Sequence, residues 1–174
     1  MRQRPLGSLL VLLASVASAQ PVLSPQAVTK AMASQGVKST LQRLFYDQKQ
    51  WSAVLAGIAT GKPAWLDVAN TFHAVADGAP GEQLESAVGE ALEHRPSNVL
   101  SIAVPNFALE VVCTAPDVDD PRFDSYELSM AAIERRQAKL RSISKSTLTA
   151  LRDSCIAELE KAKGAVAQSY ERNP

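Results

Sequence analysis

Hydrophobic residues recur along most of the chain at the spacing of an α-helix. The clearest example is Trp51, Val54, Leu55 and Ile58, which follow the i, i+3, i+4, i+7 spacing of one helix face. The same pattern, with its flanking caps and turns, predicts seven short helices and two long ones. They cover residues 26–35, 37–46, 48–60, 63–75, 82–94, 97–104, 106–113, 125–142 and about 147–170. The chain is therefore expected to be a compact, all-α, multi-helix protein.

One stretch leaves the choice between helix and strand open. Residues 99–104 form an almost continuous apolar run, which is also typical of a buried strand. Pro96 and Pro105 open this segment and the next one, and no other segment offers a partner strand. We therefore favour two short buried helices here.

Turn-forming residues suggest how the helices are grouped. Residues 77–81 form the strongest turn signal, and residues 115–123 form the best internal boundary. A single domain of residues 20–174 would thus consist of a short-helix array, 20–114, and a C-terminal helical hairpin, 124–170. Asp124 and Glu127 have the spacing of a capping box at the start of the hairpin. The short helices and tight turns resemble HEAT-type layering in architecture only, because no repeat of 30 to 45 residues is found.

The N-terminal residues have the pattern of a secretory signal peptide. Arg2 and Arg4 precede an apolar stretch at residues 6–16, and Ala17-Ser18-Ala19 provides small residues for cleavage. Cleavage after Ala19 would make residues 1–19 a signal peptide. The alternative is an uncleaved N-terminal anchor, although the apolar run is short for a bilayer span of about 20 residues.

The charge balance of the chain argues against one class of partner, nucleic acid. The chain has 18 basic and 18 acidic residues, and loss of Arg2 and Arg4 leaves 16 bases against 18 acids. A mildly acidic mature chain argues against nucleic-acid binding. We expect no membrane span after cleavage, and a periplasmic or secreted location.

The two cysteines both lie beyond the signal peptide. Exported chains mature in an oxidising compartment, so a Cys113–Cys155 disulfide is expected. The alternative is two unpaired, buried thiols.

An acidic loop is the most suggestive candidate binding site. Its charged residues are Asp117, Asp119, Asp120, Arg122 and Asp124. Spaced carboxylates can bind calcium, but Pro121 and the absence of a glycine at the sixth position break the EF-hand spacing. The alternative role of these aspartates is to cap helices and end turns. We expect no metal and no cofactor.

Other polar residues give weaker signals. His73 and His94 lack the spacing of a metalloprotease motif, and His94 is expected near a helix C-terminus. Glu82, Glu85, Glu90 and Glu93 are interpreted as a solvated helix face. The charged segment 134–141 is interpreted as the outer face of a long helix, and Trp51 and Trp65 as core residues.

Three segments carry a resemblance to other proteins. Residues 51–59, 64–69 and 120–126 resemble segments of small exported bacterial helical proteins that have no assigned activity. The resemblance implies an exported helical domain and transfers no catalytic residues.

These observations lead to a functional expectation, reached largely by exclusion. We expect a non-enzymatic helical module that binds another envelope or secreted protein. An envelope immunity protein, or an inhibitor of a secreted toxin or hydrolase, is a specific form of that idea. A structural envelope component is a further possibility. A hydrolase using carboxylates of residues 82–93 or 117–124 is the alternative from a different class.

Overall fold

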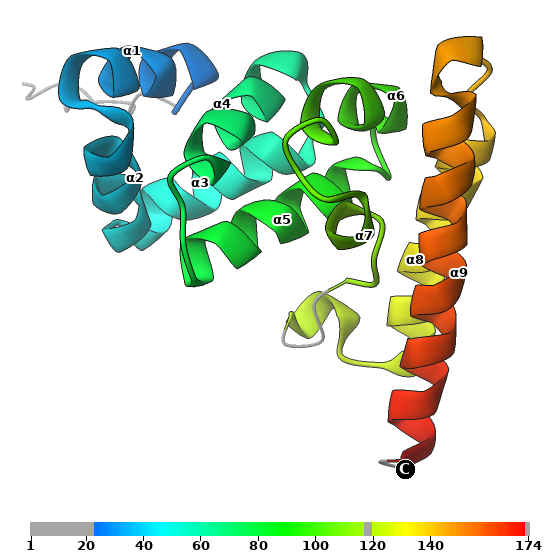
Figure 1. Cartoon of the computed structure of the whole chain (residues 1–174). Coiled ribbons are helices and arrows are strands. Elements are labelled where there is room, and N and C mark those ends of the chain that lie inside the picture. Colours follow the sequence, from blue (N-terminus) through cyan, green and yellow to red (C-terminus); the bar gives the residue numbers. More distant parts are fainter. Residues whose placement is uncertain (1–22, 117–119, 173–174) are drawn as a thin grey trace, which may run out of the picture.

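The computed structural model describes residues 23–116 and 120–172, and this part of the chain is all-α, without a β-strand (Figure 1). The predicted fold class is confirmed. The α-helices are α1 (Pro25–Gln35), α2 (Val37–Tyr46), α3 (Gln48–Ala59), α4 (Pro63–His73), α5 (Ala79–Ala91), α6 (Pro96–Asn98), α7 (Leu109–Val112), α8 (Tyr126–Arg141) and α9 (Thr149–Arg172). A π-helical turn, η1 (Val99–Ala103), and two 3-10 turns, η2 (Pro121–Phe123) and η3 (Ser146–Leu148), complete the elements. The predicted signal peptide, residues 1–19, lies outside the described residues.

Local sequence signals set the boundaries of the first helices as expected. The Ser24 hydroxyl accepts a hydrogen bond from the Ala27 amide, and the Asp47 carboxylate accepts one from Gln50. Each satisfies a backbone donor that has no partner within its helix. Gly36 has a φ of +86°, which only glycine adopts easily, and it separates α1 from α2.

Several boundaries differ from the prediction, and two of them have a clear local cause. Helix α5 begins at Ala79, because Pro80 fits the first turn of a helix and Gly78 already makes the turn with φ +54°. The predicted turn over residues 77–81 is therefore shorter. Ser125, not Asp124, caps α8, and its hydroxyl accepts a hydrogen bond from the Leu128 amide at 3.2 Å. The predicted capping box is wrong: with Ser125 as cap, the third helical residue is Leu128, which has no side-chain acceptor to reach back to the cap.

The ambiguous apolar segment is helical, as we favoured. Residues 96–103 form α6 and η1, and Val99, Leu100 and Ala103 are fully buried. The next predicted helix is shorter than expected. Its first residues make a turn, closed by the Asn106 amide on the Ala103 carbonyl, and only Leu109–Val112 is helical.

The helices of the array pack in layers against their neighbours, and the hairpin stands at one side of them (Figure 1). Helix α3 packs against α2 and α4 as well as α5. Trp51 and Trp65 are both buried, which confirms them as core residues. The indole of Trp65 occupies the space that a Cβ on Gly57 would need, so α3 and α4 approach closely. The core thus holds α3, α4 and α5 in fixed positions.

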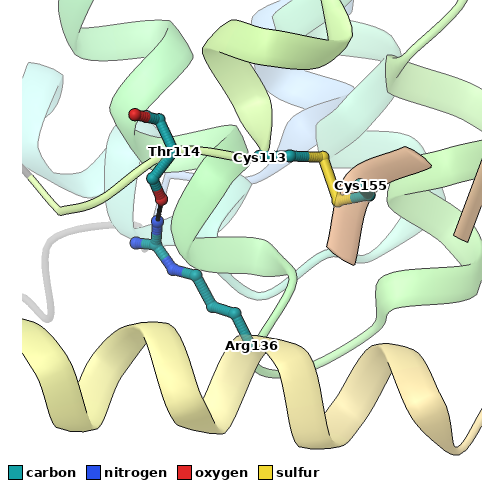
Figure 2. Close-up of a disulfide and its surroundings, with 4 residues drawn as sticks. All are labelled: Cys113, Thr114, Arg136 and Cys155. Carbon is teal, nitrogen blue, oxygen red and sulfur yellow. Dashed lines mark hydrogen bonds between the residues drawn. A yellow bond between two sulfur atoms is a disulfide. The ribbon is translucent and has the colours of Figure 1, made fainter. Parts of the chain in front are cut away.

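A covalent link fastens the C-terminal hairpin to the array. The predicted disulfide is present and links Cys113, at the end of α7, to Cys155 in α9, with the Cα atoms 5.2 Å apart. Beside it, the Arg136 guanidinium of α8 donates a hydrogen bond to the Thr114 carbonyl at 2.7 Å (Figure 2). Two consecutive residues after α7, Cys113 and Thr114, therefore bind both helices of the hairpin. We call Cys113, Thr114, Arg136 and Cys155 the hairpin joint.

The interpretation of residues 134–141 as an outer face holds for the exposed Glu134, Arg135, Lys139 and Arg141 but is wrong for Arg136. Arg136 is only 3% exposed, and it lies on the same stripe of α8 as Ile133 and Leu140. Burial lowers the pKa of Arg136 to about 10, while the Glu93 carboxylate, 3.7 Å from its Nε, acts in the opposite direction. The guanidinium therefore keeps its charge at neutral pH inside the protein.

Within residues 23–116 and 120–172, no helix is both long enough and apolar enough to cross a bilayer.

The disulfide generates a stability prediction. It closes a loop of 42 residues, and chain entropy assigns about 4 kcal/mol to such a link. The double variant Cys113→Ala/Cys155→Ala should therefore melt roughly 10 °C below the wild type, with an unchanged helical circular dichroism signal at room temperature.

Reductant serves as the control for this prediction. It should lower the Tm of the wild type to a similar degree and leave the Tm of the double variant unchanged. A wild-type Tm that is insensitive to reductant would show that the disulfide contributes nothing to stability.

Candidate functional site

An open groove of about 630 Å³ runs between α3 and α5. Most of the side chains that face each other across it are small or neutral. They are Ser52, Leu55, Ala56 and Ala59 on α3, and Gln83, Ser86 and Ala87 on α5. Because these side chains are small, α3 and α5 can pack against each other and still leave a hollow on their solvent-facing side. Its charged lining residues include Lys62, Glu90, Arg95, Asp120 and Arg122, and we call this feature the α3–α5 groove.

An ion-paired arginine lines the groove. The Arg122 guanidinium donates two hydrogen bonds to the Glu90 carboxylate, both at 2.9 Å. It also donates to the Asp120 carboxylate, with its shortest contact at 2.7 Å. Bidentate pairing of this kind fixes the planar guanidinium geometrically. Arg122 thus ties η2 to α5.

Pairing with Arg122 changes the pKa of Asp120. The hydrogen bonds from the Arg122 side chain lower the pKa of Asp120, with a smaller contribution from the Arg122 amide. The same ion pairs raise the pKa of Arg122 above its usual range. Asp120 is therefore an ionised carboxylate at any pH near neutrality.

The predicted acidic loop is only partly a single site. Asp120 and Arg122 lie together at the groove, whereas Asp124 is exposed and is not among the residues that line it. Asp117 and Asp119 lie outside the described residues. The structure adds Glu90, which the sequence analysis had not connected with this loop.

The glutamates of residues 82–94 do not form one solvated face. Glu82 is exposed, and Glu85 lies 3.2 Å from the Nε2 of His73, whose ring stacks on Phe107. The solvated-face interpretation is wrong for Glu90 and Glu93, because they connect α5 to other elements.

Glu93 makes the second of these connections. Its carboxylate accepts a hydrogen bond from Arg135 at 2.7 Å and lies beside the buried Arg136. The Glu93 side chain is 14% exposed, so water screens this pair only partly. Helix α5 is therefore bound electrostatically to both η2 and α8.

The sequence analysis missed most of the groove. Its walls consist of serine and alanine, which carry no chemical signal by themselves. The recurrence of Ser52, Ala56 and Ala59 on one face of a predicted helix was the available sign, because a stripe of small residues leaves room beside a helix. Among the described residues, no group of three or more His, Cys, Asp or Glu side chains could hold a metal ion.

Comparisons with known proteins do not assign the chain to a family. No protein-family model matches the chain, and no curated protein or solved structure is significantly similar to it. The geometry and charges of the groove are therefore the basis for a functional proposal.

The Arg122 ion pairs generate a prediction about pH. Because the pKa of Asp120 is lowered in the folded protein, its contribution to stability is complete above 3.8 and is lost as the pH falls through the folded pKa. An NMR titration of the Asp120 carboxyl carbon should have a midpoint below 3.8. In Arg122→Gln the midpoint should move upward.

Arg135→Gln is the matched control, since it removes the same charge from a neighbouring ion pair with Glu93. It should leave the Asp120 midpoint nearly unchanged. Equal titration of Asp120 in the wild type and in Arg122→Gln would contradict the assigned cause.

Proposed function

We propose that the protein is a non-enzymatic helical module of the periplasm or cell exterior that binds another envelope or secreted protein through the α3–α5 groove. The single observation that carries this proposal is the composition of that groove. It is open, most of the α3 and α5 side chains that line it are small or uncharged, and its two carboxylates are held by Arg122. Such a surface offers contact area to a protein segment and presents no reactive group.

The pairing of Glu90 and Asp120 argues against the hydrolase alternative in this groove. Hydrolysis by two carboxylates needs one protonated acid and one ionised base or nucleophile with separated pKa values. Here both carboxylates accept hydrogen bonds from one guanidinium, and this pairing lowers the pKa of Asp120. They act as structural anchors for η2.

The location outside the cytoplasm has two lines of support. One is the buried Cys113–Cys155 disulfide, because structural disulfides persist in oxidising compartments. The other is the signal-peptide pattern of residues 1–19. An immunity protein or inhibitor remains the more specific form of the proposal. A disulfide-linked scaffold suits that role, since a preorganised surface loses less entropy on binding.

Site-specific crosslinking in intact cells tests the proposal. A photoreactive amino acid at Ser86, which lines the groove, should give a discrete crosslinked product. The same replacement at Ser39, an exposed serine on α2 outside the groove, should give none. Mass spectrometry of the product would identify the partner.

A groove-filling variant makes the result specific. Ala56→Trp places an indole in the groove and should abolish the Ser86 crosslink, provided that its Tm and helical signal match the wild type. Equal crosslinking at Ser86 and Ser39, or none at Ser86, would contradict the proposal.

A further inference from the structure

A second hollow, of about 530 Å³, adjoins the α3–α5 groove. It lies between residues 94–98 of the array and residues 139–145 at the end of α8. Its walls include the polar side chains of Ser97, Asn98, Ser142 and Ser144. His94 and Arg95 line both hollows, so the two are neighbours.

Positive charge dominates the second hollow. Arg95, Lys139 and Lys145 line it, and no carboxylate is among its described lining residues. Lys62 adds another ammonium group on the side of the α3–α5 groove. Together Lys62, Arg95, Lys139 and Lys145 form what we call the basic seam.

The seam differs from the other cations near it in having no acidic partner. Arg122 and Arg135 are paired with Glu90 and Glu93. In the described part of the chain, the ammonium groups of Lys62, Lys139 and Lys145 make neither an ion pair nor a hydrogen bond.

Arg95 is the anchored member of the seam. It donates to the Thr60 carbonyl at 2.6 Å, a neutral acceptor that orients the guanidinium without cancelling its charge. The local excess of charge is also unlike the chain as a whole, which has equal numbers of acidic and basic residues.

We propose that the basic seam binds an acidic, extended segment of the protein partner, which continues from there into the α3–α5 groove. The inference rests on the proposed function and names the chemistry of the partner. Complementary charge would give the partner its orientation and a fast association rate, and the groove would supply the uncharged contacts.

Two features favour an extended protein segment over other anions. Lys139 and Lys145 line only the second hollow and Lys62 lines only the α3–α5 groove, so one small anion is not expected to meet all four cations. The neutral residues of the adjoining groove also offer contacts to a protein segment that a phosphate ion would not use. A chain of carboxylates can follow such a path and meet each cation in turn.

Fluorescence anisotropy with a labelled peptide of alternating aspartate and glutamate tests the proposal on the full, oxidised protein. The wild type should bind this peptide at physiological salt and should not bind the corresponding asparagine–glutamine peptide. Lys139→Glu/Lys145→Glu should weaken binding by at least about tenfold.

Lys30→Glu/Lys38→Glu is the matched control, because it makes the same change in net charge at exposed lysines of α1 and α2. It should keep the wild-type affinity within about twofold. Equal losses in the two double variants, or no binding by the wild type, would overturn the proposal.

Two further probes separate the other anions. One probe is a vesicle of phosphatidylcholine and phosphatidylglycerol. If the protein binds these vesicles and does not bind the acidic peptide, the seam is a membrane-binding surface and the proposal is overturned. The other probe is inorganic phosphate. If millimolar phosphate displaces the peptide completely, the seam is a site for a single small anion and the proposal is overturned. Neither is expected.

The crosslink at Ser86 distinguishes failure of this inference from failure of the proposed function. Under the inference, Lys139→Glu/Lys145→Glu weakens that crosslink in cells. A Ser86 crosslink of undiminished strength in this variant would leave the proposed function standing and would overturn the acidic-segment inference alone.

Discussion

The hairpin joint is the constraint on which the arrangement of the other parts depends. Cys113 and Thr114 are neighbours in the chain, and they bind α9 through a disulfide and α8 through the Arg136 hydrogen bond. The hairpin is thereby held against the array at the level of α5 and α7, where the absence of a Cβ on Gly89 leaves room for the Val112 carbonyl and the Arg136 guanidinium. Because the second hollow has one wall from the array and one from the hairpin, its shape depends on this joint.

The charged residues fall into two groups with different tasks. Arg122, Arg135 and Arg136 serve the fold, since they connect α5 with η2 and α8 through Glu90 and Glu93. Within the described residues, the lysines of the basic seam, Lys62, Lys139 and Lys145, make no such contact, and Arg95 bonds only a neutral carbonyl. Solvated, unpaired cations lose little free energy by staying unpaired, and they gain from a partner that brings carboxylates to them. The proposed binding role depends on this difference between paired arginines and unpaired lysines.

The sequence predicted the helices and the disulfide because these depend on local or simple rules. Hydrophobic spacing identified the buried faces of α3 and α9, and export of two cysteines predicted their pairing. It did not predict the burial of Arg136, since arginine is almost never buried without a partner, and that partner, the Thr114 carbonyl, is 22 residues away. The groove and the role of Glu90 were missed for a similar reason. Both arise only when α3, α5 and η2 are brought together in space, and small side chains carry no motif of their own.

Native-state hydrogen exchange, with and without reductant, tests the role of the hairpin joint most directly. Amides of α8 and α9 should lose protection together when Cys113 and Cys155 are reduced, while amides of α3 and α5 keep theirs, because the array has its own core around Trp51 and Trp65. Loss of protection that is uniform over the array and the hairpin would contradict this account, as would protection of α8 and α9 that is unchanged by reduction.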